Sequence, residues 1–258
     1  MAETPWHPVA LAEADWLAEL DPDGADRGFD PGSRPDAVWI LHAMYEWESG
    51  PTRTTHQDLR RSLLEAGMVE PNVVGGIDVD AWGVIETGGQ VGRSQHPGQG
   101  WRRLRWHELA QRLGEPVVAE GEQPCFRSLA GAHPDGSWPA SVEPPAEGSL
   151  DREGWSRLVE LLLQWAPMGA ATPCLAYLSP GHSPDDQARV LAGPLGAAAA
   201  LYDHDFGDGS PANLWPVDRA WVTWSDWDLW GTKVSGPSDL VEAVLADSGL
   251  EAVRLPWC

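Results

Sequence analysis

The sequence predicts an α+β protein with mixed or antiparallel sheets and short flanking helices. Two patterns lead to this fold class. Apolar residues recur at helical spacing in several short segments, whereas other short apolar runs lie between clusters of Gly, Pro, Asp and Ser, as strands do. The chain of 258 residues is 42% hydrophobic, which is enough for a buried core. This length suits one large domain or two small ones.

The first third of the chain predicts two helices and leaves one segment open. Residues 11–20 fit a short helix with one packed face, and residues 21–35 read as a loop. Asp36 can cap a helix that runs to Trp47, because Val38, Leu41 and Tyr45 share a stripe. A strand over residues 37–41 is the rival interpretation. A second helix is expected from Thr54 or Thr55 to Gly67.

The middle of the chain alternates apolar runs with turn residues. We expect strands over residues 81–86, 101–106 and 116–119, a loop over 87–100 and a short helix that ends at Gly114. The best linker candidate is the Pro-rich stretch 131–149. It predicts an N-terminal α+β unit over 1–138 and a C-terminal α+β unit over 150–258, with 139–149 as a linker or an ordered loop. A single compact body is the alternative.

The second half predicts its elements more clearly. Ser149 or Asp151 can cap a helix to Trp165, with apolar residues on one face. The remaining expectations are a strand over 174–178, short helices over 185–191 and 239–246, a helix or strand over 197–202, and a final strand over 252–255. The order of elements in the two halves is also compatible with two related α+β units.

Tryptophan is the compositional outlier, with 16 residues against 3 Phe and 3 Tyr. Five of them, from Trp215 to Trp230, fall within 16 residues, and four of these lie in a predicted β-hairpin with strands over 219–225 and 230–235. The face with Val222 and Trp224 is expected to be the core face, and Trp227, in the turn, the most exposed of the five. Trp221 is expected to pair with Trp230 across the strands. The candidate binding residues are therefore Trp224, Asp226, Trp227, Asp228 and Trp230.

Residues 214–237 read LWPVDRAWVTWSDWDLWGTKVSGP and precede a predicted helix and a short apolar strand. This stretch resembles a C-terminal module of uncharacterised actinobacterial proteins, with Trp-Pro, Asp-Arg and Trp followed by Asp-Leu, Thr, Val and Gly. The resemblance covers about the last 45 residues and, more weakly, the helix at 151–165. It implies a shared α+β module and a bacterial cytoplasm. It carries over no activity and no catalytic residue.

A second polar cluster lies at residues 203–210. Asp203, His204, Asp205 and Asp208 are weak candidates for a metal site, because carboxylates and imidazole can converge on a cation. The spacing does not match a calcium loop, whose sixth position is Gly. We therefore expect a surface turn without a tightly bound ion, and no cofactor.

Charge limits the choice of partner. The chain has 39 acidic and 17 basic residues, a formal net charge of −22. We expect no nucleic-acid partner, since such binding needs a cationic face, and no membrane partner, since no apolar run is long enough to span a bilayer. The N-terminal residues lack the pattern of a secretory signal, and the three cysteines show no disulfide framework, which favours the cytoplasm.

These observations favour a non-enzymatic binding protein. We expect an acidic protein that binds a basic protein partner, such as an immunity-like inhibitor or an adaptor, because an acidic surface accelerates capture of a basic partner. The alternative is a hydrolase or natural-product tailoring enzyme that uses Asp and His, with Asp226 and Asp228 as a carboxylate pair. A carbohydrate-binding module is the third interpretation. The sequence leaves open whether the protein is an enzyme, and what its oligomeric state is.

Overall fold

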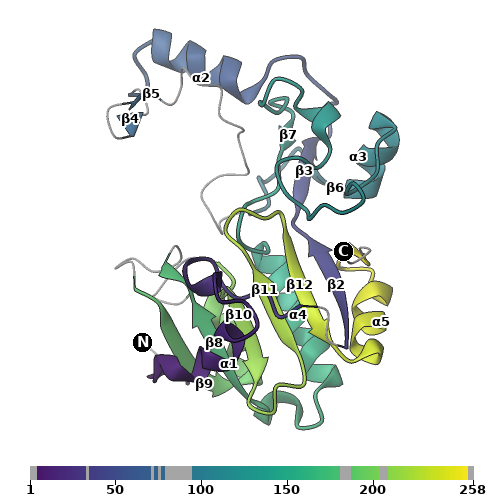
Figure 1. Ribbon diagram of the computed structural model, residues 1–258. Helices are drawn as coiled ribbons and strands as arrows, with labels where there is room; N and C mark the ends of the chain where they lie inside the picture. The colour runs from purple at the N-terminus through teal and green to yellow at the C-terminus, as the bar shows by residue number, and fades with distance from the viewer. Residues whose placement is uncertain are drawn as a thin grey trace.

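The computed structural model describes residues 5–32, 35–70, 73–74, 77–78, 95–180, 187–203 and 209–254. The protein has an α+β fold, as the sequence predicts, with one eight-stranded and one three-stranded antiparallel sheet. The larger sheet forms one body, and the smaller sheet forms a second body above it in Figure 1. Among the described residues, no helix combines the length and the apolar character needed to cross a bilayer.

The eight-stranded sheet has the order β1-β9-β8-β10-β11-β12-β2-β13. Its strands are β1 (His7–Val9), β2 (Asp36–Leu41), β8 (Pro173–Leu178), β9 (Arg189–Pro194), β10 (Asn213–Pro216), β11 (Val222–Ser225), β12 (Gly231–Gly236) and β13 (Ala252–Val253). Two of these strands, β1 and β2, precede the Pro-rich segment 139–149, and β2 lies between β12 and β13. The large sheet therefore draws strands from both of the predicted units, and the domain boundary itself stays a prediction.

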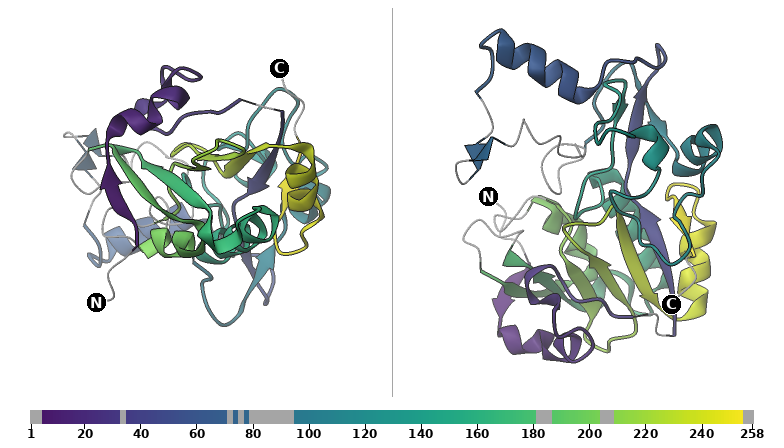
Figure 2. Two further views of the ribbon diagram at one scale, coloured as in Figure 1. Left: turned by 90° about the horizontal axis from the view of Figure 1, so that it is seen from below. Right: turned by 45° about the horizontal axis from the view of Figure 1, so that its top comes forward.

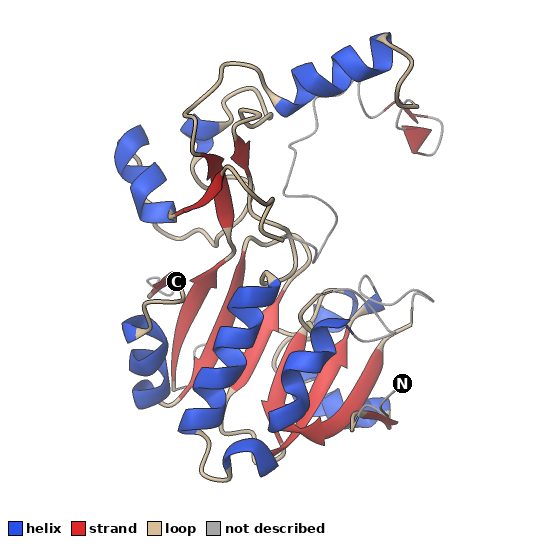
Figure 3. Ribbon diagram, turned by 180° about the vertical axis from the view of Figure 1, so that it is seen from behind, coloured by secondary structure: helices blue, strands red, loops and turns tan. Residues whose placement is uncertain are grey.

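Helices cover one face of this sheet (Figure 3). They are α4 (Arg152–Trp165), α5 (Ser238–Ala246), and the 3-10 helices η5 (Gly169–Ala171) and η7 (Leu195–Asp203). Asp151 caps α4 by accepting a hydrogen bond from Gly154 N at 3.2 Å, which supports the cap expected from the sequence. The largest apolar cluster lies between these helices and the sheet, and it includes Val38, Ile40, Trp155, Leu158, Leu214, Trp221 and Val241.

The N-terminal segment covers the opposite face (Figure 2, left). It contains η1 (Leu11–Ala14), α1 (Asp15–Ala18) and η2 (Gly24–Asp26), so the expected helix over 11–20 is present as two short pieces. Leu17 and Phe29 pack there with Tyr177 and Trp215 of the sheet. A neighbouring cluster contains Trp39, Cys125, Trp224 and Leu229. The sheet is thus buried on both faces, which explains the nearly continuous apolar runs of its strands.

The three-stranded sheet has the order β6-β3-β7. Its strands are β3 (Met44–Trp47), β6 (Trp101–Leu104) and β7 (Val142–Glu143), and the same part of the chain contains α2 (His56–Glu65), α3 (Trp106–Leu113), η4 (Ala130–Ala132) and the strand pair β4 (Val73–Val74) and β5 (Ile77–Asp78). Only His42 and Ala43 separate β2 from β3. His42 is fully buried, with Nδ1 at 2.7 Å from Ala146 O and Nε2 at 3.0 Å from Thr232 Oγ1. One short, hydrogen-bonded segment therefore joins the two sheets.

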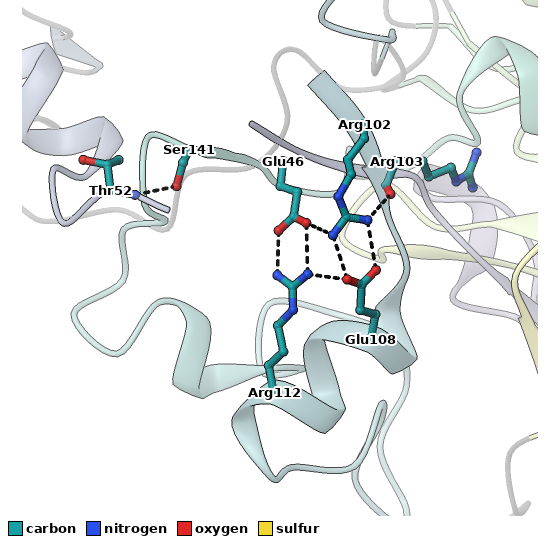
Figure 4. Close-up of polar contacts among 7 residues, drawn as sticks. All are labelled: Glu46, Thr52, Arg102, Arg103, Glu108, Arg112 and Ser141. Atoms are coloured by element: carbon teal, nitrogen blue, oxygen red, sulfur yellow. Dashed lines mark hydrogen bonds and ion pairs between the residues drawn. The ribbon is translucent and has the colours of Figure 1, made fainter. Parts of the chain in front are cut away.

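A ring of ion pairs fixes α3 against the small sheet (Figure 4). Arg112 donates two hydrogen bonds to Glu46, at 2.6 and 3.0 Å, and Arg102 donates two to Glu108, at 3.2 and 2.7 Å. Arg102 also pairs with Glu46, and Arg112 with Glu108. The two guanidinium groups lower the pKa of Glu108 to about 2. Glu46 is on β3 and Arg102 on β6, so the ring ties both strands to the helix.

Three expected elements are wrong where the structure describes them. Residues 36–47 form β2 and β3 instead of a helix, so the rival strand over 37–41 is confirmed. Burial on both faces produces an apolar run whose spacing also fits a helical stripe. Residues 116–119 are loop, and residues 189–191, expected to be helical, belong to β9. The expected strand over 81–86 lies outside the described residues.

The predicted hairpin is confirmed, and the prediction of its core face needs correction. β11 and β12 pair antiparallel, with Val222 opposite Ser235 and Ser225 opposite Thr232. The face with Trp224 is buried under the N-terminal segment, but the opposite face, with Trp221, belongs to the larger core. The expected pairing of Trp221 with Trp230 is also wrong. Trp230 lies beyond the strand pairing and packs in the small body.

Candidate binding site at the Trp227 turn

The turn that joins β11 to β12 presents one aromatic side chain to solvent. Trp227 is 44% exposed, and it is the one described tryptophan with an exposed side chain. Asp226 Oδ1 accepts a hydrogen bond from Asp228 N at 3.0 Å, and Leu229 N donates to Asp226 O at 3.0 Å. These bonds fix the turn, so Trp227 is held at the surface by an ordered backbone, with the exposed Asp228 beside it.

Two other loops support this turn. Leu229 forms an isolated antiparallel bridge with Cys125, and Trp230 N donates to Pro124 O at 2.8 Å. On the other side, Gly148 N donates to Leu229 O at 2.9 Å. The loop around Cys125 also carries an exposed aromatic residue, Phe126. The turn is therefore braced between two segments that lie far from it in the sequence.

The same turn forms one wall of an open cleft with a volume of 360 Å³. Asp226 is 6% exposed, and burial is the main cause of its raised pKa, to which the charges of Asp228 and Asp21 add. Arg27 acts in the opposite direction, with Nε at 3.5 Å from Asp226 Oδ2. The residues that line the cleft are Leu20, Asp21, Arg27, Asp30, Pro31, Gly32, Gln123, Trp224 and Asp226.

The opposite wall is residues 20–32, which we call the N-terminal strap. Asn213 Oδ1 accepts from Phe29 N at 2.8 Å, and Asn213 Nδ2 donates to Phe29 O at 2.8 Å. Ser235 Oγ donates to Gly32 O at 2.6 Å. Gly28 has a φ of +86°, and a Cβ there would lie 2.9 Å from Ala212 Cβ, so the close approach requires glycine. Side chains of the sheet thus hold the strap in place.

Lys233 lies beneath the cleft on β12. Its side chain is 3% exposed, and its Nζ is 5.7 Å from the ring centre of Trp39 and 5.6 Å from that of Trp224. Nζ donates to Asp30 Oδ1 at 2.7 Å. A buried ammonium is stable only when it is paired, and here a carboxylate and two aromatic rings surround it. The pairing also fixes Asp30 of the strap over the sheet.

A larger cavity, of 670 Å³, lies elsewhere, next to the N-terminus of α4. Tyr45 Oη donates to Asp151 Oδ2 at 3.1 Å, and the ring of His96 lies 4.9 Å from the ring of Tyr45. Burial, followed by the charge of Asp151, raises the pKa of Tyr45. None of the residues that the sequence singles out for binding lines this cavity.

The structure brings together four of the five candidate binding residues. Asp226 and Trp224 line the cleft, and Trp227 and Asp228 are exposed beside it. Trp230 is fully buried among Trp106, Trp138 and His133, so it supports the small body instead of reaching the surface. In the acidic segment, Asp203 pairs with Arg152, whereas His204, Asp205 and Asp208 lie outside the described residues.

Sequence reasoning missed the strap. Asp21, Arg27 and Asp30 lie in a loop with no motif, and their contact with the hairpin depends on the fold. One signal pointed to Lys233, since it is the single lysine of the chain and lies within a predicted strand. Among the described residues, no group of three or more His, Cys, Asp or Glu side chains is arranged to hold a metal ion.

Comparisons with protein-family models, with curated proteins and with solved structures give no match. The resemblance of residues 214–237 to an actinobacterial module therefore stays an expectation. Any function assigned to this chain rests on the geometry of its own residues.

Proposed function

We propose that the protein is a non-enzymatic binding protein that captures a basic protein partner through the Trp227 turn. The observation that carries the proposal is the exposed indole of Trp227 between two carboxylates, on a turn fixed by backbone hydrogen bonds. Tryptophan side chains held rigidly at a surface are typical anchors of protein interfaces. The partner's charge follows from complementarity with a chain of net charge −22.

The proposed biological form is an immunity-like inhibitor or an adaptor in the cytoplasm. The two described cysteines, Cys125 and Cys174, are buried free thiols, which accords with a reducing compartment. Steering by opposite charge raises the association rate, and the Trp227 contact then lowers the dissociation rate.

Quantitative affinity capture tests this proposal. The wild-type chain, Trp227→Ala and Met168→Ala serve as three baits, since Met168 is also an exposed apolar residue, at 56% against 44% for Trp227. The expected result is a basic protein retained by the wild type and by Met168→Ala but not by Trp227→Ala. Its affinity for the wild type should fall as salt concentration rises. Equal retention on all three baits, or an affinity that salt leaves unchanged, would contradict the proposal.

A hydrolase or tailoring enzyme is the second candidate, favoured by one observation. The carboxyl of Asp226 is buried in a cleft and its pKa is raised, as is common for a general acid. Metal analysis of the purified protein discriminates between the two functions. A stoichiometric divalent metal that survives dialysis favours the enzyme, because the sequence alternative relies on Asp and His chemistry.

A further inference from the structure

The cleft beside Trp227 is short of positive charge. Asp21, Asp30 and Asp226 line it, and Arg27 is the one cation among the described residues of its lining. Lys233 neutralises Asp30 from below, at 2.7 Å. Arg27 lies nearest to Asp226, whereas Asp21 Oδ2 accepts a hydrogen bond from Asp30 N at 3.0 Å. The charge of Asp21 acts on Asp226 in the direction of repulsion. A second cation in the cleft would relieve that repulsion.

Arg27 is loosely placed as a partner of Asp226. Its Nε lies 3.5 Å from Asp226 Oδ2 and forms no hydrogen bond with any described residue, and the side chain is 43% exposed. A well-docked guanidinium forms two parallel hydrogen bonds to a carboxylate at about 2.7–2.9 Å. The ion-pair ring of Arg102, Arg112 and their glutamates shows such bidentate bonding within this same protein. Asp226 can thus accept a better partner than the one it has.

One side chain that lines the cleft carries a hydrogen-bond donor without a partner among the described residues. Trp224 is 3% exposed and lines the cleft, and its Nε1 has no hydrogen-bond partner among the described residues. A Cβ on Gly28 would lie 3.2 Å from Trp224 Cδ1, so the indole edge that bears Nε1 faces the strap. Buried N–H groups without a partner are uncommon in folded proteins, and a ligand that carries an acceptor would satisfy this one.

We propose that this cleft binds the guanidinium of an arginine side chain on the basic partner, with Asp226 and Asp21 as its acceptors. Arg27 is then a resident cation that the incoming arginine displaces. The guanidinium carries five N–H donors on a planar group, which suits two carboxylates that line one cleft.

This inference rests on the proposed function and gives it a specificity pocket. Trp227 follows Asp226 directly in the chain, so the anchor and the cleft share one turn. A partner that places an arginine in the cleft can therefore contact Trp227 with the surface around that arginine. The pair of contacts would select basic partners by shape as well as by net charge.

The test uses a small probe in place of the partner. N-acetyl-arginine methylamide is titrated into the full chain, and its neutral isostere N-acetyl-citrulline methylamide is the control. The readout is the indole N–H signal of Trp224 in NMR spectra, identified by its loss in Trp224→Phe. The arginine probe should shift this signal in a saturable and salt-sensitive way, and the citrulline probe should not. Equal shifts from both probes, or none from either, would overturn the assignment.

Two substitutions should change the affinity of the arginine probe in opposite directions. Asp226→Asn keeps the acceptor for Asp228 N but loses the charge, and affinity should fall at least about tenfold. Arg27→Gln removes the resident cation, and affinity should rise about threefold or more. The matched control is Asp218→Asn, because exposed Asp218 accepts from Ala220 N in the turn between β10 and β11. Weaker binding by Arg27→Gln, or wild-type binding by Asp226→Asn, would contradict the proposal.

The outcomes separate this inference from the proposed function. The arginine probe can bind as expected while no basic protein is retained by the wild type and lost from Trp227→Ala. In that case the proposed function is wrong and the pocket remains supported. A partner retained through Trp227 and bound equally well by Asp226→Asn leaves the proposed function and removes the pocket.

Discussion

Lys233 and Asp30 lie 203 residues apart in the sequence, yet Lys233 Nζ donates a hydrogen bond to Asp30 Oδ1 at 2.7 Å. This pair joins a central strand of the large sheet to the N-terminal strap. The rings of Trp39 and Trp224 enclose the ammonium group. The buried cation therefore helps to hold the strap, and with it one wall of the candidate site, together with the hydrogen bonds from Asn213 and Ser235.

Substitution of Lys233 should destabilise the fold. Lys233→Met removes the positive charge that pairs with Asp30. The free energy of unfolding should fall by about 2–4 kcal/mol, because loss of one partner leaves the other charge unpaired. The double variant Lys233→Met/Asp30→Asn should recover part of this loss. Urea denaturation measures both. A double variant no more stable than Lys233→Met would show that the ion pair itself contributes little.

The two tryptophans at the site should differ sharply in their effect on stability. Trp224→Ala removes a buried aromatic ring and should cost about 3–5 kcal/mol of unfolding free energy. Trp227→Ala removes an exposed ring and should change stability by less than about 0.5 kcal/mol. Chemical denaturation of each variant checks this, and similar losses in both would contradict the difference in burial between the two rings.

Acid should destabilise the protein through His42. Burial lowers the pKa of folded His42 to about 4, whereas its ordinary value is 6.5. Between these values the unfolded chain binds a proton that the folded chain does not, so stability falls as pH is lowered through this window. The loss from this group is at most about 3 kcal/mol.

His42→Gln isolates this contribution, because glutamine does not titrate. The variant's unfolding free energy should depend less steeply on pH between about 4 and 6.5 than that of the wild type. The raised pKa values of Asp226, Glu143 and Glu147 act in the opposite direction, and they are common to both proteins. Parallel pH profiles for the two proteins would refute the role of His42.

The ion-pair ring should contribute more than an isolated surface pair. Glu46→Gln breaks contacts to both Arg102 and Arg112 and should cost about 1–2 kcal/mol, because Glu46 is largely buried and belongs to a network. The matched control is Glu122→Gln, which breaks one exposed pair with Arg127 and should cost less than about 0.5 kcal/mol. Thermal unfolding at low and high salt compares the two variants.

Local sequence signals were sufficient to predict those elements that follow a single known rule of capping or alternation. Thr55 and Asp58 form the capping box that begins α2, and Gly114 ends α3 in the left-handed conformation. The β11–β12 hairpin follows from alternation and from the Asp-Trp-Asp turn. The helix predictions for residues 36–47 and 189–191 were wrong for the same reason. A strand buried on both faces lacks the alternation that distinguishes it from a helix.

The candidate site was predictable only in its hairpin half. Asp226, Trp227 and Asp228 stand out because carboxylates and an exposed aromatic share a turn. The other half comes from Asp21 and Arg27, whose position depends on the hydrogen bonds between Asn213 and the backbone of Phe29. Such contacts between distant segments leave no periodicity in the sequence, so no local pattern indicates them.

The place of β2 in the large sheet has a consequence for synthesis on the ribosome. Residues 36–41 are translated early, but both of their neighbours, β12 and β13, lie near the other end of the 258-residue chain. The nascent chain must therefore carry an apolar strand with two unpaired edges while about 190 further residues are made. This part of the sheet can therefore form only after β12 and β13 have been made.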